Sequence, residues 1–258
     1  MKHSTTLIYD GTFNGFLTAV FVAFEEKINV SDIQKNGQNQ NGLFSDTKTI
    51  FTNVEKAKRV WNTIRNKSHN AITNIYFSFL SESEGIELIL YTYIQRLMDS
   101  KASTHLNYSD GIVQRVNQLA SAVGREKQRT EKLVDFQITK DDVRFAMVEP
   151  DANILPLISK HFRSIYSNQS WLIYDLKRGY GIYYNQNQVE LISLNLQEVH
   201  LTKTFKSDAF LNDEYDYPTL LNDYIKNTKI KALINRKLFS ESVSKGKRRS
   251  LTMTKEAV

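Results

Sequence analysis

The pattern of apolar residues changes near residue 133, and this change constrains the fold more than any other feature. Before it, apolar side chains recur every three or four residues, the period of amphipathic helices. After it, short apolar runs separated by turn residues predict strands. We therefore predict an α+β fold, with an α-rich N-terminal half followed by an antiparallel β-sheet with packed helices. A single domain would span 1–225, helical over about 1–132 and sheet-rich over about 133–225.

The individual elements follow from the same patterns. Helices are expected at 12–26, 53–67, 70–80, 84–98, 110–132 and 154–165. Strands are expected at 5–9, 133–138, 143–148, 171–176, 181–185 and 189–194. Residues 30–45 are rich in Asn, Gln and Gly and predict a loop.

Basic residues are concentrated at the C-terminal end. Residues 226–258 contain ten lysines and arginines and two glutamates, a net charge of +8. The whole chain carries +6, so residues 1–225 carry −2. A basic tail of this kind attracts polyanions, above all nucleic acid, through counterion release. The alternatives are a solvated tail and a final packed helix. The tail cations expected to contact phosphates are Lys245, Lys247, Arg248 and Arg249.

Several classes of chemistry lack the residues they need. The chain has no cysteine, which excludes a disulfide scaffold, an iron–sulfur site and a thiol nucleophile. Its five histidines are scattered without metal-ligand spacing, so we expect no metal or other cofactor. The longest apolar run, Phe16–Phe24, is too short to span a bilayer, and the first residues lack a signal-peptide core. We expect a cytoplasmic protein without a membrane partner.

Two arginines on the helix expected at 110–132 form a candidate phosphate clamp. Arg125 and Arg129 lie four residues apart and therefore share a helix face. Two guanidinium groups on one face could bind a phosphate bidentately. Surface ion pairs with Glu126 and Glu131 are the alternative.

A hairpin expected over 171–184 offers a second basic site. It would place Lys177 and Arg178 at its tip, with Tyr180 beside them. Cations interleaved with aromatic rings suit single-stranded nucleic acid, because bases stack on rings while cations follow the phosphates. Since strand side chains alternate between faces, some tyrosines of this hairpin belong to the core.

Four titratable residues in the second half are candidates for acid/base chemistry. Glu149 and Asp151 follow one expected strand, His161 lies on the next helix, and Asp175 ends another strand. For Asp151 helix capping is the alternative, and for His161 packing on an apolar helix face.

The turn after the first strand has two interpretations. The sequence of residues 9–15 (YDGTFNG) predicts the end of a strand, a turn and the start of a helix. Backbone N–H groups there could bind a phosphate, whereas a tight turn with a Thr12 helix cap is the structural interpretation.

Three stretches together resemble the bacterial DUF4130 family, whose members are assigned to DNA metabolism or DNA repair. They begin with YDGTFNGFLTAVF at residue 9, VGREKQR at residue 123, and EPDxNILP at residue 149, the last followed by WLIYDxKRGYG at residue 171. The resemblance implies a role in DNA repair beside a radical-SAM protein encoded nearby. A related domain is fused to uracil-DNA-glycosylase-like domains, but this chain shows no glycosylase motif.

Three functions remain open from the sequence. The first is a nucleic-acid-binding accessory protein of DNA repair or modification, with the preference for single- or double-stranded DNA undecided. The second is an enzyme acting on a damaged base or nucleotide through Glu149, Asp151, His161 and Asp175. The third is a protein–protein adaptor that makes no contact with DNA.

Overall fold

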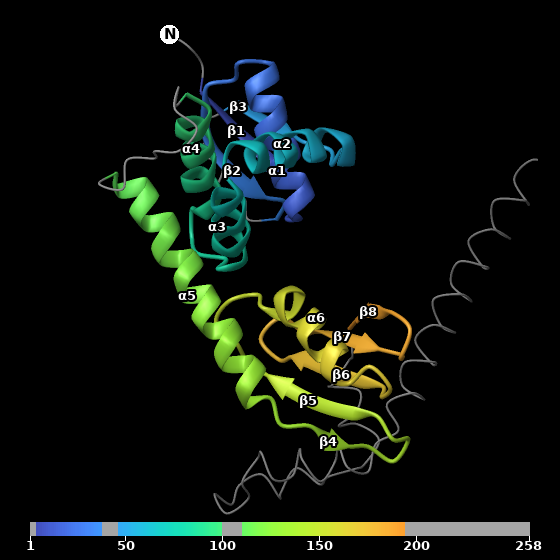
Figure 1. Cartoon of the computed structure of the whole chain (residues 1–258). Helices are drawn as coiled ribbons and strands as arrows, with labels where there is room; N and C mark the ends of the chain where they lie inside the picture. The colour runs from blue at the N-terminus through green and yellow to red at the C-terminus, as the bar shows by residue number, and fades with distance from the viewer. Residues whose placement is uncertain (1–3, 38–45, 100–109, 194–258) are drawn as a thin grey trace, which may run out of the picture. The chain divides into compact units, whose positions relative to one another are not determined.

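The computed structural model describes residues 4–37, 46–99 and 110–193 (Figure 1). The described residues form two compact units, one comprising residues 4–37, 46–99, 110–128 and 151–154 and the other residues 129–150 and 155–193. Helix α5 (Gly111–Leu133) continues through the boundary in the sequence. A single domain over 1–225 and a basic tail from residue 226 stay predictions, because residues 194–258 lie outside the described part.

A small parallel sheet lies in the N-terminal unit. Its strands are β1 (Thr5–Tyr9), β2 (Val30–Lys35) and β3 (Asp46–Thr49), in the order β2-β1-β3. The central strand β1 pairs in parallel with both neighbours. Helix α1 (Phe13–Glu25) connects β1 to β2, as a parallel crossover requires.

Strand β2 corrects the prediction of a loop over residues 30–45. Residues 30–35 form a parallel ladder with β1 that ends in the pair Tyr9 and Lys35. The ladder uses backbone groups, so a polar segment can join it, and Ile33 is the one β2 residue buried in the core. The sequence pattern missed this strand because the pattern depends on buried apolar side chains, and β2 buries only Ile33. Residues 38–45 lie outside the described residues.

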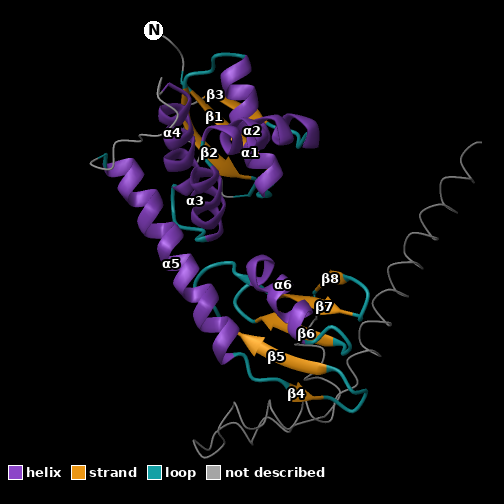
Figure 2. Ribbon diagram, viewed as in Figure 1, coloured by secondary structure: helices purple, strands orange, loops and turns teal. Residues whose placement is uncertain are grey.

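The predicted helices of the first half are confirmed, with ends shifted by one or two residues. Figure 2 shows them in purple. Thr12, Asn53 and Ser68 cap three of them, each accepting a hydrogen bond from the backbone N–H three residues later. Asp110 accepts a hydrogen bond from the Ile112 N–H at the start of α5. The remaining helices are α2 (Val54–Lys67), α3 (His69–Leu80) and α4 (Ile86–Asp99).

The C-terminal unit contains a five-stranded sheet in the order β4-β5-β6-β7-β8. Strands β5 and β6 are parallel and the other pairs antiparallel. The α+β class is thus confirmed, but the sheet is mixed where we predicted an antiparallel one. Helix α6 lies between β5 and β6 in the sequence. It returns the chain to the end of the sheet at which β5 begins, so β5 and β6 run parallel. The elements are β4 (Gln137–Ile138), β5 (Arg144–Val148), α6 (Leu155–Ile165), β6 (Trp171–Asp175), β7 (Tyr180–Tyr184) and β8 (Val189–Ile192).

Helix α6 packs on one face of this sheet through aromatic side chains. The ring centroids of Phe162 and Trp171 are 6.1 Å apart in an edge-to-face arrangement, and Trp171 lies 5.5 Å from the ring of Tyr184. All five residues of β6 are buried, so this central strand is covered on both faces.

Candidate functional site

The two arginines of the predicted phosphate clamp are exposed on α5. Arg125 and Arg129 lie four residues apart on this helix, and the apolar stripe that packs inward includes Val116 and Val123. Their spacing places both guanidinium groups on one helix face. The structure therefore leaves these two side chains accessible to a ligand.

Glu126, between the two arginines, binds backbone. Its carboxylate accepts hydrogen bonds from the N–H groups of Asp151 at 2.6 Å and Ala152 at 2.9 Å. The next amide, that of Asn153, donates to the Leu80 carbonyl at 2.8 Å. Glu126 thus joins two of the stretches that carry the family resemblance. Glu126 therefore binds backbone N–H groups in place of the surface ion pairs expected as the alternative.

Asp151 does not occupy the N-cap position of α6. That helix begins at Leu155, and an N-cap residue directly precedes the first helical residue. Asp151 lies four residues earlier, where its backbone N–H is bound by Glu126. It belongs to the N-terminal unit, whereas Glu149, His161 and Asp175 belong to the C-terminal unit.

The predicted hairpin is present, and the two cations predicted at its tip differ in exposure. Lys177 is exposed. Arg178 has a side chain only 11% exposed, and its Nη1 donates to Asp175 Oδ2 at 2.9 Å and to the Pro150 carbonyl at 3.0 Å. Gly179 has a φ of +67°, a conformation that glycine adopts without strain. Tyr180 opens β7 opposite Asp175 and is half-buried.

Asp175 is a structural partner of Arg178. Its side chain is fully buried, and its second carboxylate oxygen, Oδ1, accepts the backbone N–H of Arg178 at 3.1 Å. A buried carboxylate needs such a cation and such donors. Arg178 and Asp175, predicted for different functions, therefore form one buried pair that shapes the turn.

The other acid/base candidates of the C-terminal unit are separate from this pair. His161 lies on α6 with its Nδ1 3.9 Å from Glu131 Oε1, and its ring meets Phe162 edge to face. Glu149 is exposed just after β5. Within the described residues, no hydrogen bond or ion pair joins Glu149, His161 and Asp175.

The structure places only the candidate residues before residue 194. The four candidates of the tail lie outside the described residues: Lys245, Lys247, Arg248 and Arg249. Among the residues it does describe, no group of three or more His, Asp or Glu side chains comes together as a metal site would require. The same part of the chain contains no helix long and apolar enough to cross a bilayer.

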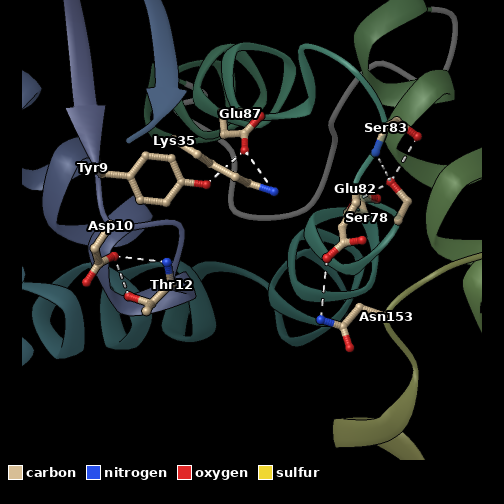
Figure 3. A network of polar contacts seen from close by, with 10 residues as sticks. Tyr9, Asp10, Thr12, Lys35, Ser78, Glu82, Ser83, Glu87 and Asn153 are labelled. Atoms are coloured by element: carbon tan, nitrogen blue, oxygen red, sulfur yellow. Dashed lines mark hydrogen bonds and ion pairs between the residues drawn. The ribbon is translucent and has the colours of Figure 1, made fainter. Parts of the chain in front are cut away.

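The structure also shows a buried polar cluster that sequence reasoning missed. The Tyr9 phenol donates to Glu87 Oε1 at 2.8 Å, and the Lys35 ammonium lies 3.7 Å from the same oxygen (Figure 3). Both Tyr9 and Glu87 are buried. Burial, and after it the charge of Glu87, raises the pKa of Tyr9, so the phenol stays protonated as the donor. The cluster ties α4 to the strands β1 and β2.

This cluster lies at a distinctive edge of the N-terminal sheet. Tyr9 ends β1 and Lys35 ends β2, and because the strands are parallel both lie at the same edge. Strand β1 is the central strand of this sheet, with β2 and β3 on opposite sides of it. The available sequence signal was an acid, Glu87, inside the apolar pattern of the helix predicted at 84–98.

The turn after β1 is a hydrogen-bonded cap. The Asp10 carboxylate accepts from the Thr12 N–H at 2.9 Å, the Thr12 hydroxyl at 2.7 Å and the Thr52 hydroxyl at 2.7 Å. A Cβ on Gly15 would clash with the Asp10 carboxylate, so a larger residue there would displace the group that makes these hydrogen bonds. The structure supports the turn-and-cap interpretation of residues 9–15.

Asp10 should make stability pH-dependent in acid. Burial raises its pKa, but the hydrogen bonds from Thr52 and Thr12 outweigh burial and hold the pKa below its ordinary value. A lowered folded-state pKa contributes stability above the unfolded value of about 4, and this contribution is lost as pH falls through the folded pKa. We expect the melting temperature to fall less steeply below about pH 4 in Asp10→Asn than in the parent, with Thr52→Val in between. Equal slopes in all three proteins, measured by calorimetry, would contradict this account.

The fold and the site together define an α+β protein with a small parallel sheet in one unit and a mixed sheet in the other. Its surface carries an arginine pair on α5 and a lysine in the β6–β7 turn. The family model for DUF4130, a domain of unknown function, matches residues 84–252, and the chain belongs to this family. No curated protein matches the chain.

Proposed function

We propose that this chain is a cytoplasmic, nucleic-acid-binding accessory protein of DNA repair or modification. The observation that carries the proposal is the uneven charge, +8 over residues 226–258 and −2 over the rest. Cations concentrated in this way bind phosphates by releasing condensed counterions. The resemblance to proteins of DNA metabolism supports DNA as the polyanion and a radical-SAM protein as the partner.

In this proposal, residues before the basic tail also contact the nucleic acid. Arg125 and Arg129 are exposed on α5 and would bind phosphates. Lys177 in the β6–β7 turn would bind another, with Tyr180 beside it for stacking on a base. Arg178 would act as a positioning residue, because its guanidinium group holds Asp175 and the Pro150 carbonyl.

The direct test is equilibrium binding of the whole chain to single- and double-stranded oligonucleotides, followed by fluorescence anisotropy. We expect binding at low salt that weakens steeply as salt rises. Co-purification with a protein partner in the absence of any oligonucleotide binding would favour the adaptor and contradict the proposal.

Reversing both arginine charges on α5 should weaken DNA binding. We expect Arg125→Glu with Arg129→Glu to lower affinity at least about tenfold at low salt and to reduce the salt slope by about 2, because two phosphate contacts are lost. The matched control is Arg59→Glu with Arg65→Glu, the same change of charge on two exposed arginines of α2. Equal loss in both variants would show that only net charge matters and would remove Arg125 and Arg129 from the site.

A further inference from the structure

The sheet of the C-terminal unit has a second apolar face. Strand pairing places Phe145, Leu172 and Tyr183 side by side across three strands, and Met147, Tyr174 and Ile192 in the adjacent row. We call this surface the second face. Its hydrophobic cluster comprises Val143, Phe145, Leu172, Tyr174 and Tyr183, with Met147 and Ile192 packed against them.

Helix α6 does not cover this face. It contacts Trp171, and the side chains of Trp171 and Leu172 point to opposite faces because they are neighbours in a strand. Among the described residues, the cluster contains only side chains of the sheet and of the turn before β5.

The second face is nevertheless buried. The five cluster residues are each 7% exposed or less. A sheet in water buries an apolar face against another layer, because a single sheet cannot shield it. Another layer therefore covers this face, and among the described residues neither helix α6 nor the strands themselves provide it.

We propose that residues 218–227 of the same chain cover the second face as an amphipathic helix. Leu220, Leu221, Tyr224 and Ile225 follow a helical period, while Asn222, Asp223 and Lys226 fall on the opposite side. Pro218 suits the first turn of a helix. Ten helical residues span about 15 Å, close to the roughly 17 Å of a five-residue strand.

The length of the chain and the family match support this occupant. After Ile192 the chain has 66 further residues, of which 25 precede residue 218 and can easily return to the sheet. The family match runs to residue 252, so residues 218–227 belong to the region that defines the family. The basic residues from Lys229 onward would then begin beside this sheet. The proposal is independent of nucleic-acid binding.

The absence of native cysteine allows a clean test by thiol labelling of the full chain. Met147→Cys places a thiol on the second face, and Leu191→Cys, at a side chain 75% exposed, gives the reference rate. We expect the Met147→Cys thiol to react at least about tenfold more slowly than the reference. Adding Leu221→Asp with Ile225→Asp should remove this protection, whereas Asn222→Asp with Lys226→Asp, on the polar side of the same helix, should preserve it.

Other results would overturn the proposal. Rapid labelling of Met147→Cys in the parent chain would show that the face is uncovered. Protection that survives Leu221→Asp with Ile225→Asp, or that depends on protein concentration, would assign the cover to another segment or to a second copy. Circular dichroism checks that each variant is folded. If the aspartate pair unfolds the chain, Leu221→Ala with Ile225→Ala replaces it and should speed labelling by a smaller factor.

Discussion

Arg178→Ala should lower the free energy of unfolding by about 3 kcal/mol, because it leaves a buried carboxylate without its cation. Asp175 is fully buried, and the Arg178 guanidinium group is 2.9 Å from its Oδ2. The backbone N–H of Arg178 would continue to donate to Oδ1 in the variant, which keeps the loss below that of an isolated buried charge. Chemical denaturation of the parent and the variant measures the difference.

A double variant separates the buried pair from a general loss of packing. Asp175→Asn with Arg178→Met removes both charges, so no unpaired charge remains and much of the lost stability should return. If Arg178→Ala were as stable as the parent and only weakened DNA binding, Arg178 would be a phosphate contact and our structural assignment would be wrong.

Glu87→Ala should cost a similar amount, about 3 kcal/mol, because it removes the acceptor of a buried phenol and the counter-charge of a lysine. The Tyr9 hydroxyl would lose its partner at 2.8 Å, and the Lys35 ammonium would lose the carboxylate 3.7 Å away. Urea denaturation followed by Trp fluorescence measures this loss.

The matched control is Glu87→Gln. Its side-chain oxygen can still accept the Tyr9 hydrogen bond, so the loss should be clearly smaller than for Glu87→Ala. Equal losses in the two variants would mean that the carboxylate charge, through Lys35, dominates the cluster. No loss in either would contradict the assignment of Glu87 as the tie between α4 and the sheet.

The sequence predicted those parts of the fold that depend on side-chain periodicity and local caps. The stripe of α5 and the caps Thr12 and Asp110 are such features, and all three are confirmed. Strand β2 was missed because its pairing uses backbone groups and buries only Ile33. The parallel pair β5–β6 was missed because strand direction depends on the connection through α6, which a local pattern does not encode.

The candidate site was predictable only in part, for a related reason. Exposure of Arg125 and Arg129 follows from the helix period, and the structure places both on the surface. The pair Asp175–Arg178 and the contacts of Glu126 arise from turns and from segments 25 residues apart in the chain. Charge alone could not distinguish a cation that binds a ligand from one that neutralises a buried acid.

DNA affinity measured over about 50 to 200 mM salt, for the whole chain and for a tail variant, tests nucleic-acid binding by this chain. The variant carries Gln in place of Lys245, Lys247, Arg248 and Arg249. We predict that its salt slope on double-stranded DNA is shallower by about 3 to 4, with residual affinity that reversing Arg125 and Arg129 abolishes. Salt-independent binding, or no binding by the whole chain at the lowest salt, would contradict a nucleic-acid-binding function.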